Sequence, residues 1–418
     1  MSPLVPREFR SLLRGPLGWF YATTLVTSLG IGLTLVFSVV YVHDIRHLSV
    51  AIATGLLAVN AVVGLAASPV IGTMTDRHGP VPVYLCLVGA EVVATVSWAF
   101  ADSLLWLAVT SVVLAASSGA LFGPGAALLA RLVPEDLRQQ AFGTNFMILN
   151  LGIGIGGLVS AVVVDLHRPV TFTWLYLGTA TFGALALLPM LHLRRLGGPV
   201  PVEELTEEES REGWREVVAD HRLVFFILAS IVLLTFGYGS LDAGFSLFVV
   251  DQGHLAVRVV SIALFFNTVT IVAAQLFVLR VVDGRSRTGL LAAVSVFWAI
   301  AWLAIGASVH LRHVGAIALL CGAQVVFALG ETLWSPVGPA LVNELAPEHL
   351  RGRYNAAFGL TWGLSGAVAP LVAGLFLGSH LADLWPYAVG VGAVVGGVLV
   401  YRLRSGLTPA EDGRTVAT

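Results

Sequence analysis

Three carboxylates lie deep inside long apolar stretches of the sequence: Glu91, Asp242 and Glu331. Glu331 stands in "FALGETLWSPVGP" and is the only charged residue between Val314 and Asn343. A carboxylate buried as an ion without a partner costs several kcal/mol, and no arginine or lysine lies at a comparable depth to pair with these three. Burial becomes tolerable when the group holds a proton. The sequence therefore predicts sites that bind and release protons.

The elements that must position these acids are membrane-spanning helices. Of the 418 residues, 57% are hydrophobic and only 11% are charged, whereas about 25% of residues are charged in a soluble domain. A helix needs about 20 apolar residues to cross a bilayer, and twelve such runs recur along the chain. They lie at about 17–42, 50–74, 81–101, 104–131, 141–164, 170–193, 223–250, 257–280, 288–308, 314–343, 354–378 and 384–403. Long continuous runs indicate an all-α integral membrane protein rather than a β-barrel.

The basic residues predict the orientation of these spans. With an even number of spans, both termini share one side of the membrane with the loops after spans 2, 4, 6, 8 and 10. All 23 basic residues are arginine; only Arg46, Arg168, Arg258 and Arg312 fall on the opposite side, so the other 19 lie with the termini. By the positive-inside rule both termini are expected to be cytoplasmic. Arginine without lysine fits a GC-rich coding sequence, so the expected location is the bacterial cytoplasmic membrane.

A repeat divides the chain into two halves. "LFGPGAALLARLVPEDLRQQ" at 121–140 returns as "LWSPVGPALVNELAPEHLRGR" at 333–353, so that Pro124 matches Pro336. The P-E-x-L-R core at 134–138 likewise matches 347–351, and Asp76 matches Asp283. Both copies occupy the same place in a six-helix half, which indicates two parallel six-helix repeats at 1–193 and 223–418.

A charged segment at 194–222 connects these halves and is expected to be a cytoplasmic loop. Within it, "EEESREGWREVVADH" has the pattern of a short amphipathic helix. We interpret the segment as a solvated linker, with a regulatory or partner-binding role as the alternative.

The loop after the second span carries a recognisable motif. In "GTMTDRHGPVPVYL", 72–85, an Asp-Arg pair stands in a turn bounded by glycines, where it can lie against the positive N-terminal end of a neighbouring helix. Gly72, Asp76, Arg77 and Gly79 match the G-x-x-x-D-R-x-G pattern of the major facilitator superfamily, which the chain resembles over nearly its whole length. The usual basic pair that follows is replaced by Pro80-Val81. The resemblance implies a major facilitator fold in which these four residues act as a conformational latch.

Two further segments resemble the proton-driven antiporters of that superfamily. "NLGIGIGGLVS" in the fifth span is similar to their glycine-rich stretch, although Ile155-Gly156 stands where the pattern has Gly-Pro. Its glycines favour close helix packing, with an antiporter gate as the alternative. The fourth span lacks the arginine of many relatives. The chain thus resembles multidrug–proton antiporters that instead hold acids in helices 7 and 10, here Asp242 and Glu331.

The resemblance also implies which residues face the substrate, because helices 1, 4, 7 and 10 line the central cavity in this superfamily. Gln324, Phe327 and Ser335 share the helical face of Glu331, with Trp334 beside them, and Tyr238 flanks Asp242. Thr27 and Thr34 belong to a hydroxyl stripe in the first span. The expected substrate-binding set is Glu331, Gln324, Phe327, Trp334, Tyr238, Asp242, Thr27 and Thr34.

The expected proton-coupling set is Asp242, Glu331 and Glu91, although Glu91 lies in a peripheral helix, which favours a structural role. Glu331 matches Gly119 in the repeat, so the first half has no acid there.

These features predict a proton-coupled transporter that works by alternating access. The expected activity is efflux of small hydrophobic or cationic compounds, as in multidrug and antibiotic resistance. The alternative is an exporter or importer of one metabolite, such as a sugar, an amino acid or a siderophore. No Walker loop, metal-ligand spacing or nucleophile motif is present, so we expect no cofactor, no metal, no nucleic acid and no enzymatic activity. The expected partners are a small molecule, protons and the lipid bilayer, and the protein is expected to be a monomer.

Overall fold

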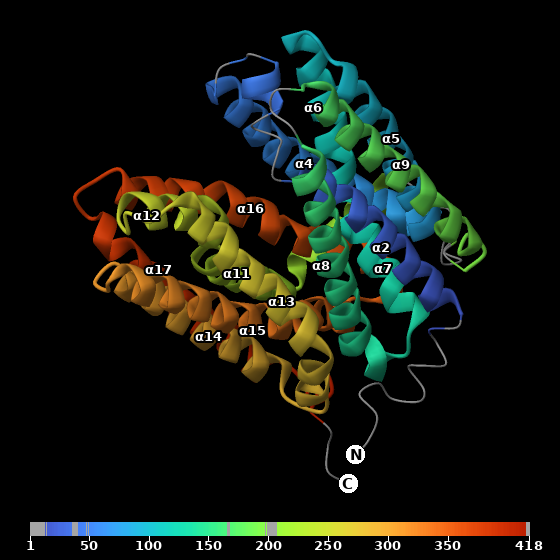
Figure 1. Ribbon diagram of the computed structural model, residues 1–418. Coiled ribbons are helices and arrows are strands. Elements are labelled where there is room, and N and C mark those ends of the chain that lie inside the picture. The colour runs from blue at the N-terminus through green and yellow to red at the C-terminus, as the bar shows by residue number, and fades with distance from the viewer. Residues whose placement is uncertain are drawn as a thin grey trace. The chain divides into compact units, whose positions relative to one another are not determined.

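The protein is helical throughout the residues that the computed structural model describes, which are 13, 15–35, 41–46, 48, 50–164, 168–196, 198 and 207–414. The helices follow in the order α2 (Pro16–Thr34), α4 (Val50–His78), α5 (Pro80–Phe100), α6 (Leu104–Ala120), α7 (Phe122–Leu132), α8 (Arg138–Val163), α9 (Val170–His192), α10 (Glu207–Ala219), α11 (His221–Leu234), α12 (Ser246–Asp251), α13 (Val257–Val282), α14 (Arg287–Ser308), α15 (His313–Leu345), α16 (Arg351–Leu377) and α17 (Trp385–Arg402) (Figure 1). Two π-helical turns, η3 (Thr235–Gly239) and η4 (Leu241–Phe245), stand between α11 and α12.

These helices coincide with the spans expected from hydropathy. In the described part of the chain, ten helical segments are long and apolar enough to cross a membrane. The second predicted span, 50–74, lies within α4, whereas α2 covers the first predicted span, 17–42, only to Thr34. Residues 36–40 of that span lie outside the described residues, and its end lies in the π-helical turn η1 (Tyr41–Ile45). The predicted amphipathic helix of the central segment appears as α10, while residue 197 and residues 199–206 of that segment lie outside the described residues. The prediction of an all-α integral membrane fold is confirmed.

Two predicted spans are not continuous α-helices. Span 104–131 is divided at Leu121 into α6 and α7, and Pro124 lies in the first turn of α7, where its missing N–H leaves no hydrogen bond unmade. Span 223–250 passes from α11 through η3 and η4 into α12. Those turns contain Gly237, Gly239 and Gly244, and the Ser240 hydroxyl donates to the Thr235 carbonyl oxygen at 2.8 Å. Such π turns often mark functional sites.

The chain forms two compact units. The first comprises residues 1–141, 145–214 and 346–359, and the second comprises 142–144, 215–345 and 360–418. The segment 346–359, which contains the second P-E-x-L-R copy and the first turns of α16, thus groups with the first unit. In that unit α2 packs on α9, α5 packs on α6 and α9, and α4 packs on α6.

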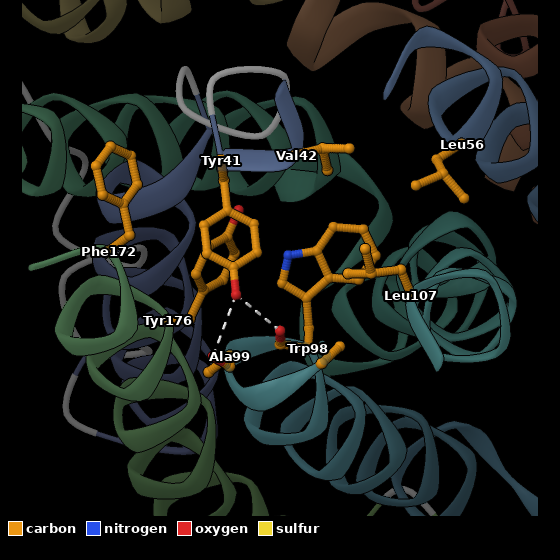
Figure 2. Close-up of a cluster of buried hydrophobic side chains, with 9 residues drawn as sticks. Tyr41, Val42, Leu56, Trp98, Ala99, Leu107, Phe172 and Tyr176 are labelled. Carbon is orange, nitrogen blue, oxygen red and sulfur yellow. Dashed lines mark hydrogen bonds between the residues drawn. The ribbon is translucent and has the colours of Figure 1, made fainter. Parts of the chain in front are cut away.

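One end of the first unit is closed by an aromatic cluster (Figure 2). Tyr41 is fully buried beside Phe172 and Tyr176, with ring centroids at 6.2 and 4.7 Å. Its hydroxyl lies 3.1 Å from the carbonyl oxygens of both Trp98 and Ala99, to which it can donate. The buried phenol therefore keeps a hydrogen bond while its ring fills the core, so the end of α5 is tied to the segment that follows α2.

Glycines allow the closest helix contacts of the first unit. A Cβ on Gly156 of α8 would lie 2.9 Å from the Cα of Gly32 in α2, and a Cβ on Gly152 would collide with the Ser28 side chain. A Cβ on Gly119 would lie 2.7 Å from the Cα of Gly64 in α4. The glycine-rich stretch of the fifth span therefore packs directly on the first span, as small residues at membrane helix interfaces do.

The second unit is built around α14, which packs on α15 and α17, while α13 packs on α15 and α11 on α17 (Figure 1). Trp298 of α14 is fully buried at its centre. Gly237 in η3 and Gly330 in α15 both lie against the Trp298 indole, where a side chain would collide with the ring. The indole thus sets how closely α14, α15 and the first π turn approach one another.

The orientation of the helices is testable with single cysteines. We expect Ser379, in an outward loop, to label from outside when it is changed to cysteine. Ser405, just after α17, should label only from inside, because the arginine distribution predicts a cytoplasmic C-terminus. Both serines are exposed, and the native Cys86 and Cys321 would first be replaced by alanine. Labelling of intact cells with an impermeant maleimide provides the measurement; the reverse pattern would contradict the orientation.

Candidate functional site

Glu331 lies in the middle of α15 and is 5% exposed. The Asn267 side-chain amide, on α13, donates to Glu331 Oε2 at 2.6 Å, and Asn267 is itself buried. Among the described residues Glu331 forms no ion pair with an arginine. Its partner is therefore a neutral amide, which can donate to the carboxyl group whether or not that group carries a proton. This is the environment of a carboxyl that changes protonation without rearrangement.

The two π turns place a second acid near Glu331. Tyr238 of η3 is half-buried, and the charges of Asp242 and Glu331 both act on its phenol group. Asp242 of η4 is exposed, and its charge also acts on Glu331. All three residues belong to the second unit, and we refer to Tyr238, Asp242 and Glu331 together as the acid cluster. Two carboxylates in such a cluster repel each other when both are ionised, so a proton or a cation relieves the repulsion.

The aromatic residues expected beside Glu331 are packed into the interior of the second unit. Phe327 is fully buried and stacks on Trp298 with centroids 5.2 Å apart, and Trp298 Nε1 donates to the Phe327 carbonyl oxygen at 3.2 Å. Trp334 is buried with its centroid 6.5 Å from that of Trp298. Both residues therefore hold α15 against α14 in this structure. The rings of Tyr238 and Trp362 of α16 are nearly perpendicular, with centroids 5.1 Å apart.

Gln324 lies two turns before Glu331 and is fully buried. Neither its side-chain oxygen nor its nitrogen has a hydrogen-bond partner within the described residues. The buried hydroxyl oxygen of Ser335, one turn after Glu331, is likewise without a partner there. Buried polar groups without hydrogen bonds cost stability. The side chains of Gln324 and Ser335 could therefore form hydrogen bonds with a bound molecule.

Three residues at this site were not predicted from the sequence. They are Asn267, Trp298 and Trp362, which come from α13, α14 and α16. The available signal for Asn267 was an amide among apolar residues in "LFFNTVTI". Trp298 and Trp362 gave no signal, because an aromatic residue in a membrane span is ordinary core by composition. The π turns were also missed, although three glycines within eight residues mark the place.

The remaining predicted site residues belong to the first unit. Thr27 donates to the carbonyl oxygens of Thr23 and Thr24 at 2.9 and 3.0 Å, and Thr34 lies 3.5 Å from the Thr179 hydroxyl on α9. Glu91 on α5 is half-buried and acts electrostatically on Tyr84. Gly119, the repeat counterpart of Glu331, supports the contact of α6 with α4. The first unit thus uses for helix packing the position that carries the acid in the second.

The predicted latch motif makes a closely fitted contact. Asp76 is 7% exposed, and its Oδ1 and Oδ2 accept hydrogen bonds from the backbone N–H groups of Gly352 and Arg353 at 2.7 and 3.2 Å. Arg353 Nη1 lies 3.4 Å from Asp76 Oδ2. A Cβ on Gly72 would lie 2.6 Å from that of Ala356. The carboxylate therefore lies at the N-terminus of α16, where unpaired N–H groups and the helix dipole favour a negative charge.

The other motif residues shape the turn. Gly79 has a φ of 88°, which residues with a side chain rarely adopt, and it is the single residue between α4 and α5. The predicted turn around Asp76 and Arg77 is wrong, because α4 continues as a helix to His78. Arg77 is exposed on the last turn of α4. Burial raises the pKa of Asp76 to about 7, while Arg353, the two N–H groups and Arg131 act to lower it. The contact can therefore respond to pH in the range around neutrality.

The linker helix α10 joins this contact. Trp214 Nε1 donates to the Thr73 hydroxyl on α4 at 2.9 Å. A Cβ on Gly213 would lie 2.7 Å from Arg353 Nη1, the atom that pairs with Asp76. The part of the linker that carries Trp214 is thus packed against the latch residues.

The second unit has no copy of the Asp76 contact in the described residues, because Asp283, its repeat counterpart, is exposed. In the second unit Asp412 of the C-terminal tail lies at a different helix start, that of α14. It is buried, and it accepts hydrogen bonds from the Ser286 hydroxyl at 2.7 Å and the Thr288 N–H at 2.9 Å. The N-terminus of α14 is therefore capped by the tail.

Comparison with known proteins gives a consistent result. A family model described as "Major Facilitator Superfamily" matches residues 20–295 and 245–416. The uncharacterized MFS-type transporter YhjO of Bacillus subtilis is 21% identical over 391 residues, covering 94% of each chain. The class C tetracycline resistance protein of Escherichia coli is 30% identical over 177 residues, covering 40% of this chain and 41% of its own.

Solved structures share the fold at low identity. The human organic anion transporter MFSD10 (TETRAN) superposes with a TM-score of 0.74 at 15% identity, covering 95% of this chain and all of its own. A bacterial homologue of the iron transporter ferroportin, in an outward-facing state, also gives 0.74 at 14% identity, covering 94% of this chain and all of its own.

Proposed function

Because the chain belongs to the major facilitator superfamily and is a multi-pass membrane transporter, we propose that it exports small hydrophobic or cationic compounds in exchange for protons. The observation that carries this proposal is the burial of Glu331 against the neutral Asn267 amide, with Asp242 close enough to act on its charge. Two neighbouring acids of this kind favour a single positive charge between them, supplied by a proton or by a substrate cation.

The exchange follows because a proton and a substrate cation compete for the same two carboxylates. When Glu331 carries a proton, it stays buried as a neutral hydrogen-bonding group and holds a cation weakly. When the proton leaves, the two carboxylates repel each other, and a substrate cation relieves that repulsion. Proton and substrate thus occupy the cluster in alternation. Exchange of one proton for one monovalent cation moves no net charge, so the pH difference across the membrane drives it with about 1.4 kcal/mol per pH unit, and efflux needs no ATP.

Alternating access would expose the cluster to each side in turn through movement of the halves 1–193 and 223–418, joined by the 194–222 linker. The Asp76 contact with the start of α16 would favour one of these states, and Trp214 would couple the linker to it. We place the protein in the bacterial cytoplasmic membrane with both termini inside, acting as a monomer.

The tetracycline resistance relative supports drug efflux as the role of this transporter. The alternative is a transporter dedicated to one metabolite. Anionic metabolites are poorly served by two carboxylates and a tyrosine, whereas lipophilic cations suit carboxylates beside aromatic rings.

Transport by the purified protein provides the test. In proteoliposomes with an imposed pH gradient, we expect uptake of lipophilic cationic dyes driven by the gradient and abolished by a protonophore, as proton exchange requires. A panel of cationic, neutral and anionic compounds would separate the two roles. Gradient-driven movement of one metabolite, with none of the dyes transported, would support the dedicated transporter instead.

A further inference from the structure

A cavity lies within the first unit and is lined by none of the acid-cluster residues. It has a volume of about 660 Å³ and is formed by the end of α7, the turn after it, the turn after α9 and the start of α16. Its charged lining consists of Arg131, Arg138, Arg195, Arg351, Glu135 and Glu348. Of these residues, Arg131 alone has been named above, where its charge acts on Asp76.

The two copies of the P-E-x-L-R repeat meet at this cavity. Glu135 and Arg138 come from the first copy, and Glu348 and Arg351 come from the second. Each copy forms the same internal ion pair, with N–O distances of 3.2 and 3.8 Å. Both glutamate side chains are 66% exposed, whereas the arginines are 4% and 11% exposed. The repeat therefore presents its positive groups inward and its negative groups toward solvent.

The arginines leave positive charge in the cavity without full compensation. Four arginines and two glutamates line the cavity, the Asp76 charge also acts on Arg131, and Arg138 and Arg131 both repel the Arg351 guanidinium. Arg131 donates from Nη1 to the Gly198 carbonyl oxygen at 2.9 Å. The buried Nε atoms of Arg131 and Arg351 have no hydrogen-bond partner in the described part of the chain. An anion with several acceptor oxygens would satisfy these donors and relieve the repulsion.

The edge of the cavity is apolar and continues along a membrane helix. Leu196 lines the cavity and is exposed, and Leu188 and Leu191 on the last turns of α9 are exposed as well. α9 is one of the segments long and apolar enough to cross a membrane. A ligand that fits both features has an anionic head for the arginines and hydrocarbon chains for the leucines.

We propose that this cavity binds a phosphate group and that the group belongs to the headgroup of an anionic phospholipid, whose acyl chains lie along the exposed leucines of α9. Guanidinium groups match phosphate oxygens in pairs of parallel hydrogen bonds, and basic pockets at the ends of membrane helices suit such headgroups. Because the second repeat copy lies at the start of α16, an occupied cavity would hold that segment to the first unit.

Lipid retention by the full-length protein tests this assignment. The protein would be purified from nanodiscs of equal phosphatidylglycerol and phosphatidylcholine, and bound lipid would be counted by native mass spectrometry. We expect retained phosphatidylglycerol in the parent. Arg195→Gln, at an exposed position, should lower the retention about fivefold, and Arg131→Gln with Arg195→Gln more than about tenfold. Arg194→Gln is the matched control, because Arg194 is an exposed neighbour that does not line the cavity.

Inorganic phosphate, added at millimolar concentration, identifies the source of the phosphate group. Retained phosphatidylglycerol that is sensitive to Arg195 and unaffected by phosphate supports the headgroup. Suppose instead that the protein shows no preference for phosphatidylglycerol but binds inorganic phosphate in a way that depends on Arg195. The cavity would then be a phosphate site, and the assignment to a lipid headgroup would be wrong. Equal retention of both lipids by the parent and all variants, without phosphate binding, would overturn the proposal.

Discussion

Glu331→Gln is expected to leave the protein folded and inserted but to abolish proton-driven efflux of cationic compounds. Glutamine keeps the size of the side chain and can still pair with the Asn267 amide, so the contact between α13 and α15 should survive. What disappears is the exchangeable proton and the charge that attracts a cation. Initial rates of cation transport in proteoliposomes with a pH gradient should fall to those of protein-free liposomes.

Binding and transport together separate the roles of this residue. The glutamine variant should also bind cationic dyes with much less pH dependence than the parent. Glu216→Gln serves as the control, because Glu216 is exposed on α10 and its change removes the same charge elsewhere. If Glu331→Gln transported cations at the parental rate under the gradient, Glu331 would be a structural hydrogen-bonding group and the proposed exchange would be wrong.

Asp76→Asn is expected to loosen the start of α16 from α4. The asparagine oxygen can accept one backbone N–H but cannot pair with Arg353, which is buried and would lose its carboxylate partner. A hydrogen bond that involves a charged group contributes about 2 kcal/mol, which corresponds to about thirtyfold faster opening. Hydrogen–deuterium exchange at the amides of Gly352 and Arg353 measures this opening. Asp102→Asn, at an exposed acid of the same unit, is the control.

The same contact should weaken as pH rises. Burial raises the pKa of Asp76 to about 7, whereas a solvated aspartate titrates near about 4. The engaged state therefore holds a proton that the opened state has released between these values. The contact is strongest below about pH 4, weakens as pH rises to about 7, and is constant above that. Arg353 and Arg131, which act on Asp76, stay charged throughout this range.

Exchange measured from pH 5 to pH 8 and corrected for intrinsic rates should therefore show falling protection of Gly352 and Arg353 in the parent protein. The Asp76→Asn variant, which has no titrating group there, should show a protection that does not change with pH. Parental protection that does not change with pH would exclude Asp76 as the source of a pH response, even if the substitution itself loosens the contact.

Several properties of this protein follow from the sequence alone. Hydropathy over about 20 residues determines a membrane helix because the bilayer core excludes unpaired backbone groups, so the spans were predictable without tertiary information. A carboxylate such as Glu331 stands out because ionised groups are costly in such spans. Asp76 was recognisable through the spacing of its glycines, and the repeat through direct comparison of 121–140 with 333–353.

The tertiary structure alone decided which groups these residues meet. Asn267 lies 64 positions from Glu331 and Gly352 lies 276 positions from Asp76, and no local pattern encodes pairings over such separations. Burial of Phe327 against Trp298 likewise depends on where Gly330 and Gly237 allow α14 to approach. The two P-E-x-L-R copies read as separate loops in the sequence, and only the folded chain brings their arginines to one cavity. The local sequence determines the free-energy cost of burying each polar group. Helix packing determines which partner forms the hydrogen bond that reduces this cost.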